Sequence, residues 1–233
     1  MQLRIVEEIF ERFPDFVCGI VACSNADNKG ENQTLTKLLR EAETDIRNHF
    51  VLEGLSQNPF FHSWRKAYSA FRTDPTKFKC SSEALVRRVL KGDNIRHINK
   101  LVDAYNYISL KYRTPVGGED LAAIKETICL RFADGDEHFV ALGGDDEELV
   151  EKGEVVYASG KEILCRKWNW RESERTKLTE STENAILVID ALPPLTKEDV
   201  KKSTKDLATL VSEYCNAKTV IFVLTAENNQ TSW

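Results

Sequence analysis

The spacing of apolar residues changes near residue 114, and this change constrains the fold more than any other feature. Before it, apolar side chains recur every three or four residues over 31–55, 60–72, 82–92 and 101–112, which indicates amphipathic helices. After it, short apolar runs alternate with polar turns, which is typical of strands. This order favours an α+β chain with helices mainly in the N-terminal half and a sandwich-like core of β-sheet.

The remaining elements complete that prediction. Phe16–Ser24 is an apolar run bounded by polar residues, so we expect a buried strand ahead of the helices. No Pro- or Ser-rich linker divides the chain, so we expect a single domain over 1–233 with a helical N-terminal part over 1–79. The later predicted elements are strands at 127–132, 138–142, 155–158, 162–166, 185–190 and 219–224, a helix at 196–216, and a frayed polar tail at 227–233.

Composition excludes several classes of protein. No segment approaches the roughly 20 apolar residues that a membrane helix needs, and the first residues lack a signal-peptide pattern. The six cysteines form no CxxC pair and have no histidine at ligand spacing. We therefore expect a cytoplasmic protein with reduced, buried thiols, no metal, no cofactor and no membrane partner.

Familiar catalytic motifs are absent. The chain has no GxxxxGK[ST], GxGxxG, GxSxG or HExxH pattern, which argues against a kinase, a Rossmann oxidoreductase or a common hydrolase. His97 and His138 can act as bases in principle, but an isolated histidine is more often structural.

Charge is divided unevenly along the chain. The net charge is -5, yet residues 62–113 hold twelve Lys or Arg against four Asp or Glu, while 114–160 hold three against twelve. A basic segment of this kind is typical of a polyanion-binding face or of solvated helix surfaces. The aromatic stripe Phe61, Trp64, Tyr68 and Phe71 is likewise either a core face or a base-stacking platform.

The segment Leu101–Asp120 joins an amphipathic helix to the sequence PVGGED. We expect Pro115 to stop the helix and Gly117-Gly118 to form a turn that presents Glu119 and Asp120 to a site. A helix that merely ends in a flexible loop has the same pattern.

Two further segments are candidates for ligand contacts. In CRKWNWRESERT, residues 165–176, Trp168 and Trp170 are expected to share a strand face among arginines, an arrangement suited to stacking a base, or alternatively to packing on a neighbouring helix. Asp190 ends an apolar run and is either a loop anchor or a polar group at a pocket mouth.

These segments together resemble a known domain. Basic helices leading into INKLVDAYNYISLKYRTPVGGEDL, followed by strands ending in AILVID, are similar to the tRNA-editing (B3/B4) domain of the bacterial phenylalanyl-tRNA synthetase β subunit. In that family a VVDxTNYV helix leads to a GQPxHAFD turn, then to strands and a pocket carboxylate. The resemblance covers roughly residues 80–192, and the chain looks like a free-standing version of the domain.

The resemblance implies an aminoacyl-tRNA deacylase. The family domain hydrolyses the ester between a wrong amino acid, chiefly tyrosine, and the 3′-terminal adenosine of tRNA, so the implied partner here is the acceptor end of mischarged tRNA, without DNA. Asn106 would shape the pocket floor, and Asp190 would read an amino group or a polar side-chain tip. No catalytic residue is assigned. The implied aminoacyl pocket consists of Asn106, Tyr107, Pro115, Gly117, Gly118, Glu119, Asp120 and Asp190, and the implied tRNA-binding residues are Arg87, Arg88, Arg96, Arg166, Trp168, Asn169, Trp170 and Arg171.

The chain also departs from the family pattern. Gly117 stands where the family has histidine, Glu119 where it has phenylalanine, and Tyr105 where it has threonine. Recognition of a tyrosyl hydroxyl is therefore not implied, although an activated ester can be hydrolysed by a positioned water without a protein base. The alternatives are a tRNA-binding module without catalysis and a binder of a small amino acid or metabolite.

Overall fold

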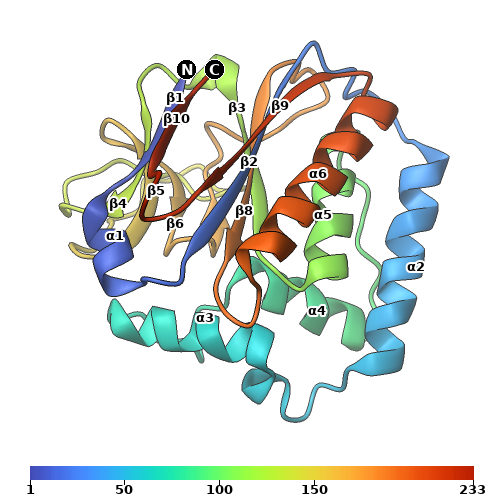
Figure 1. Cartoon of the computed structure of the whole chain (residues 1–233), viewed down its shortest axis with the longest axis horizontal. Helices are drawn as coiled ribbons and strands as arrows, with labels where there is room; N and C mark the ends of the chain where they lie inside the picture. Colours follow the sequence, from blue (N-terminus) through green and yellow to red (C-terminus); the bar gives the residue numbers. More distant parts are fainter.

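A computed structural model describes all residues 1–233 and confirms the α+β class (Figure 1). The helices are α1 (Glu7–Arg12), α2 (Gln33–His49), α3 (Pro59–Ala70), α4 (Ser81–Leu90), α5 (Lys100–Tyr112) and α6 (Lys197–Tyr214). The strands are β1 (Gln2–Ile5), β2 (Val17–Ser24), β3 (Val116–Asp120), β4 (Ile128–Phe132), β5 (Val155–Ser159), β6 (Glu162–Arg166), β7 (Arg171–Glu172), β8 (Ala185–Ala191), β9 (Lys218–Leu224) and β10 (Gln230–Ser232). No helix is both long and apolar enough to cross a membrane.

The strands form two sheets. One has four strands in the order β3-β8-β2-β9, all antiparallel to their neighbours. The other has six strands in the order β10-β1-β4-β5-β6-β7, with one parallel pair, β1 and β4. The two chain ends lie side by side, because β1 and β10 are paired (Figure 1).

The four-stranded sheet lies between a layer of helices and the six-stranded sheet. On β2, Cys18 and Ile20 pack into the core that also holds residues of β4, β5 and β6, whereas Val21 and Cys23 pack with residues of α5 and α6. Alternate side chains of a strand point to opposite faces, so both faces of β2 are covered, as its uninterrupted apolar sequence predicts. Asp190 on β8 has the same parity as Ile186, which belongs to the core between the sheets.

Helix α3 packs against the core with its aromatic stripe. Phe61, Trp64, Tyr68 and Phe71 are all almost fully buried, and they belong to the core between the two sheets. The stripe is therefore a core face and does not form an exposed platform for base stacking. Helices α3 and α4 lie beneath the sheets in Figure 1.

Several local predictions are wrong. The PVGGED segment is not a turn: α5 ends at Tyr112, Arg113 takes a left-handed conformation, and Val116–Asp120 pairs with β8 as an edge strand. Residues 138–142 form only isolated bridges, whose partners are Glu162, Glu147 and Ser173. The tail is not frayed, since β10 extends the six-stranded sheet.

Candidate functional site

Two neighbouring strands present polar residues to the space between the sheets. Gly117 pairs with Val188 and Glu119 pairs with Ile186 in the β3–β8 register. Residues two apart share a face of a strand, so Glu119 and Gly117 face the same side as Ile186, Val188 and Asp190. The alternation that buries the apolar residues therefore also turns two carboxyl groups inward.

A tight connection between β6 and β7 brings further residues to this space. Lys167 and Trp168 have φ values of 47° and 67°, in the left-handed region that non-glycine residues rarely adopt. This conformation turns the chain immediately after β6, so Trp168 enters the core and Asn169 points toward Asp190. The backbone carbonyl of Asn169 accepts a hydrogen bond from the amide of Ser81, the first residue of α4, at 3.0 Å.

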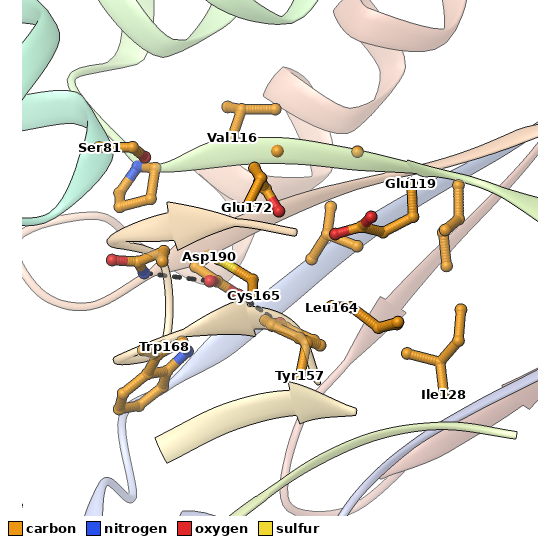
Figure 2. A pocket seen from close by; sticks show the side chains of 16 residues that line it. Ser81, Val116, Glu119, Ile128, Tyr157, Leu164, Cys165, Trp168, Glu172 and Asp190 are labelled. Atoms are coloured by element: carbon orange, nitrogen blue, oxygen red, sulfur yellow. Dashed lines mark hydrogen bonds between the residues drawn. The ribbon is translucent and has the colours of Figure 1, made fainter. Parts of the chain in front are cut away.

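These elements enclose a pocket near the edges of both sheets (Figure 2). About 30 Å³ of it is open to the centre of a water-sized group, which is enough for at least one water molecule or a group of similar size. The lining residues are Ser81, Pro115, Val116, Gly117, Gly118, Glu119, Ile128, Tyr157, Leu164, Cys165, Trp168, Asn169, Glu172, Ile186, Val188 and Asp190.

Asp190 is the most firmly held carboxyl group of the pocket. The hydroxyl of Tyr157 donates to its Oδ1 at 2.6 Å, and the amide of Asn169 donates to its Oδ2 at 3.1 Å. Asn169 in turn accepts a hydrogen bond from Tyr68 at 3.0 Å. Both donors to Asp190 are themselves buried, so the position and orientation of the carboxyl group are fixed by the core.

Burial shifts the ionisation of Asp190 into the neutral range. The residue is only 3% exposed, and loss of hydration disfavours its charged form. Burial raises the pKa of Asp190 to about 7, although the hydrogen bonds from Tyr157 and Asn169 act in the opposite direction. A carboxyl group with this pKa exchanges a proton near neutral pH, as a general base must.

Glu119 and Glu172 form a second acidic group in the pocket. Burial, followed by repulsion from Glu172, raises the pKa of Glu119 well above its ordinary value, and burial also raises the pKa of Glu172. The Oε2 atoms of both residues are buried without a hydrogen-bond partner. Gly117 makes room for this pair, because a Cβ atom at that position would collide with Oε1 of Glu172.

Five of the eight predicted aminoacyl-pocket residues line this cavity, namely Pro115, Gly117, Gly118, Glu119 and Asp190. The other three do not. Asn106 and Tyr107 lie on α5, whose residues pack with α2, with α6 and with the opposite face of the four-stranded sheet. Asp120 caps the short helical turn after β3 and accepts a hydrogen bond from Thr182 at 2.6 Å.

Three of the predicted tRNA-binding residues are buried, so they do not form part of an exposed face. Trp168 packs edge-on against Phe13, Phe16 and Trp64 and has no exposed surface. Arg166 is paired with Glu154 and Glu148. The expectation of one strand face carrying both tryptophans is wrong, because the turn at 167–168 separates them. Asn169 is the third buried residue, and it lines the pocket.

The other predicted tRNA-binding residues lie nearer the surface. Arg88, Arg96 and Arg171 are exposed, while Arg87 is held by the buried carboxylate of Glu83. Trp170 is half-buried against Phe78.

Sequence reasoning missed Tyr157, Cys165 and Glu172. Glu172 belongs to the segment 165–176 that was singled out for its tryptophans, and it is the first of the two carboxylates, Glu172 and Glu174, that follow them. Tyr157 and Cys165 sit in predicted apolar strands, so their polar atoms gave no signal of a pocket. His97 and His138 pair with Asp103 and Glu147, and neither lines the cavity.

Comparison with known proteins identifies the family of this fold and pocket. Residues 63–216 match the model of the B3/4 domain. The chain belongs to the B3/4 domain family. The matched segment includes every pocket residue from Ser81 to Asp190, so this B3/4 domain carries its cavity within the part that defines the family.

Curated relatives of this B3/4 domain are much longer proteins. It is similar to the phenylalanine-tRNA ligase beta subunit of Lactiplantibacillus plantarum, with 35% identity over 72 residues, which is 30% of the chain and 9% of that protein. The same subunit of Photorhabdus laumondii is 27% identical over 117 residues, covering 50% of the chain and 14% of that protein. The chain is also similar to an N-terminal fragment of the phenylalanyl-tRNA synthetase beta subunit from Pyrococcus horikoshii. The alignment covers 92% of the chain and 49% of that fragment, with a TM-score of 0.46 and 15% identity.

Proposed function

We propose that this B3/4 domain hydrolyses the ester bond of mischarged aminoacyl-tRNA in trans. The observation that carries the proposal is Asp190, a buried, hydrogen-bonded carboxyl group whose pKa of about 7 suits proton transfer at neutral pH. Membership of the B3/4 family and similarity to phenylalanine-tRNA ligase beta subunits support a substrate that carries tRNA. An aminoacyl ester is the reactive bond of such a substrate.

The pocket supplies the groups that this reaction needs. Ionised Asp190 can accept a proton from a water molecule, for which the cavity has room. The buried indole Nε1–H of Trp168 lies in the same cavity beside Asp190, where such a donor can stabilise charge that develops on the ester carbonyl oxygen. The water then attacks the carbonyl carbon, and the bond to the ribose oxygen of the tRNA breaks as that oxygen takes up the proton that Asp190 accepted and leaves as a hydroxyl.

Exposed cations on α4 and the segment after it are placed to contact the RNA. Ser81 at the start of α4 lines the pocket, and the surface of the same helix and of the segment that follows carries Arg88, Lys91 and Arg96. Ion pairs with phosphates depend on exposed Lys and Arg side chains. We propose that these residues replace Arg166, Trp168 and Asn169 as contacts for the acceptor arm.

A binding module without catalysis is the second candidate. No histidine lines the pocket, and burial, together with Glu172 and Glu119, raises the pKa of Cys165 well above its ordinary value, so this thiol is not an activated nucleophile. If Asp190 does not act as a base, the same pocket would bind an aminoacyl end or a free amino acid without cleaving it.

A panel of individually aminoacylated tRNAs tests the proposal. Each is incubated with the parent chain, with Asp190→Asn and with Asn106→Ala, and release of the amino acid is followed at pH 7.5. We expect at least one ester to be hydrolysed faster than in buffer, by the parent and by Asn106→Ala but not by Asp190→Asn. If the parent hydrolyses no ester faster than buffer does, the proposal fails, and a binding module without catalysis becomes the function. Equal activity of Asp190→Asn would show that the catalytic group lies elsewhere.

A further inference from the structure

The pocket is lined by acidic side chains and by no basic side chain. Glu119, Glu172 and Asp190 line it, and none of its sixteen lining residues is Lys, Arg or His. Buried carboxylates are normally paired with a cation or with several hydrogen-bond donors. Asp190 has two donors, from Tyr157 and Asn169, so its carboxylate is satisfied within the protein. The other two carboxyl groups are not satisfied in this way.

Glu119 carries an open acceptor site. The residue is 6% exposed, and its buried Oε2 atom has no N–H donor from the protein; its polar neighbours are the carboxyl group of Glu172 and the hydroxyl of Thr176. Figure 2 shows its carboxyl group directed into the pocket on the side of Glu172. Oε2 of Glu172 is buried and unpartnered in the same way. Leaving such a group unsatisfied costs free energy, and the natural complement to two adjacent carboxyl groups is a cation with several N–H donors.

We propose that Glu119 and Glu172 bind a primary ammonium group of the ligand, carried either by the α-amino group of an amino acid or by a side-chain amine. An ammonium group has three donors and is close to a water molecule in size, so it suits a small cavity. The inference rests on the proposed function only in placing the ammonium on an amino acid. It gives Glu119 and Glu172 the role of recognising charge, while Asp190 acts at the ester.

A metal ion is a poorer fit to these carboxyl groups. Three metal-ligating side chains within reach of one ion occur only at Asp134, Asp136 and Glu137, which lie outside the pocket. The oxygen atoms of Glu119, Glu172 and Asp190 do not converge on one point in that way. Hard cations such as calcium and magnesium need more oxygen ligands than the pair of glutamates supplies.

Binding of a cation here depends on pH. Tyr105 on α5, Cys165 on β6 and Asp190 on β8 are the other titratable groups near the pair, and none of them carries positive charge. Without ligand, burial and repulsion from Glu172 raise the pKa of Glu119, which favours its protonated form. An ammonium group favours the ionised pair, so its binding releases a proton and strengthens as pH rises through the range in which the carboxyl groups ionise.

Four amides separate the two possible sources of the ammonium. Lysinamide has both amino groups, norleucinamide has only the α-amino group, Nα-acetyl-lysinamide has only the side-chain amine, and Nα-acetyl-norleucinamide has neither. Amides are used because their binding is measurable whether or not the chain hydrolyses esters. Calorimetry at pH 8 measures the dissociation constant of each for the parent chain, Glu119→Gln, Glu172→Gln and, as a control, Asp145→Asn, which removes an exposed carboxylate outside the pocket.

We expect at least one amine-bearing amide to bind the parent at least about tenfold more tightly than the doubly blocked amide, as a charge-assisted hydrogen bond predicts. Glu119→Gln and Glu172→Gln should each remove most of this preference, and Asp145→Asn should keep it. The amide that binds identifies the amine. The inference is overturned if the blocked amide binds as well as the others, if no amide binds, or if both glutamine variants keep the preference. Amine binding without ester hydrolysis in the tRNA panel would overturn the proposed function alone, and hydrolysis without amine preference would overturn this inference alone.

Discussion

The carboxyl group of Glu172 occupies the space that a side chain at Gly117 would fill, because a Cβ atom there would collide with Oε1 of Glu172. Gly117 is on the edge strand of one sheet and Glu172 on the edge strand of the other. The glycine thus makes room for the Glu172 side chain, and its φ does not lie in the left-handed region. This contact closes the acidic side of the pocket.

Gly117→Ala should therefore displace Glu172 and weaken both amine binding and ester hydrolysis. The colliding atom is the end of a flexible side chain that can shift, so the cost should lie at or below the low end of the roughly 1–3 kcal/mol that overpacking costs, measurable by urea unfolding. The matched test is the double variant with Glu172→Asp, whose shorter side chain leaves room for the new methyl group. If the double variant is no more stable than Gly117→Ala, steric conflict with Glu172 is not the cause.

Asp190 should make the protein less stable as pH rises from about 4 to about 7. The pKa of Asp190 is about 7 in the folded chain and near its ordinary value of 3.8 in the unfolded chain, so the folded state binds more protons in this window and its free energy of unfolding falls as pH increases. Asp190→Asn removes this dependence. Relative to the parent, the variant should gain about 1.4 kcal/mol for each pH unit across the window. Urea unfolding between pH 4.5 and pH 8 measures the difference, and parallel curves for the two proteins would contradict the raised pKa.

Much of the fold was predictable because strong local patterns decided it. Asn32 caps α2, Thr196 caps α6 with Asp199, and β6 has the predicted limits. The errors fall where pairing partners distant in sequence decide the structure. Nothing near Gly117-Gly118 indicates that β8 will pair with it, and residues 230–232 become a strand only because β1 offers a free edge.

The site was predictable only in part for a related reason. Asp190 stood out as a carboxylate in an apolar run, and Gly117 and Glu119 as departures from a family pattern. Asn106 was placed wrongly because it was expected to meet a turn, whereas the segment after α5 is a strand that turns its polar face away from the helix layer. Trp168 was misplaced because its left-handed backbone conformation carries no mark in the sequence.

The two tryptophans should differ in their contribution to stability. Trp168→Ala removes a fully buried ring that contacts three other aromatic rings edge-on and should cost about 3–5 kcal/mol. Trp170→Ala removes a half-buried ring whose aromatic contact is Phe78 and should cost clearly less. Urea unfolding of both variants measures the costs, and equal values would argue against a core position for Trp168.

Tyr157→Phe should change the pH dependence of ester hydrolysis. The Tyr157 hydroxyl stabilises ionised Asp190 through a 2.6 Å hydrogen bond and thereby lowers its pKa. Its removal should move the midpoint of the acidic limb of kcat/KM to higher pH, since the base must be ionised to act. Tyr68→Phe is the matched control, because Tyr68 bonds to Asn169 and not to Asp190. If the midpoint is unchanged in Tyr157→Phe, the acidic limb of the pH profile does not report the ionisation of Asp190.

The exposed cations should control tRNA binding. Arg88→Ala and Arg96→Ala should each weaken binding and reduce the dependence of the logarithm of affinity on the logarithm of salt by about 1. Lys218→Ala, at an exposed position on β9, should leave both quantities unchanged. Filter binding at several salt concentrations measures them. Equal effects of all three changes would indicate a diffuse attraction with no defined RNA face.

The central claim is that Asp190 acts as the base in ester hydrolysis. Its most direct test is the single-turnover rate at pH 7.5 for the aminoacyl-tRNA that the parent hydrolyses fastest, compared between parent and Asp190→Asn at saturating protein. We expect a rate at least about 100-fold lower in the variant, as loss of a general base typically produces, with tRNA affinity retained. A variant that hydrolyses the ester at the parental rate would contradict it.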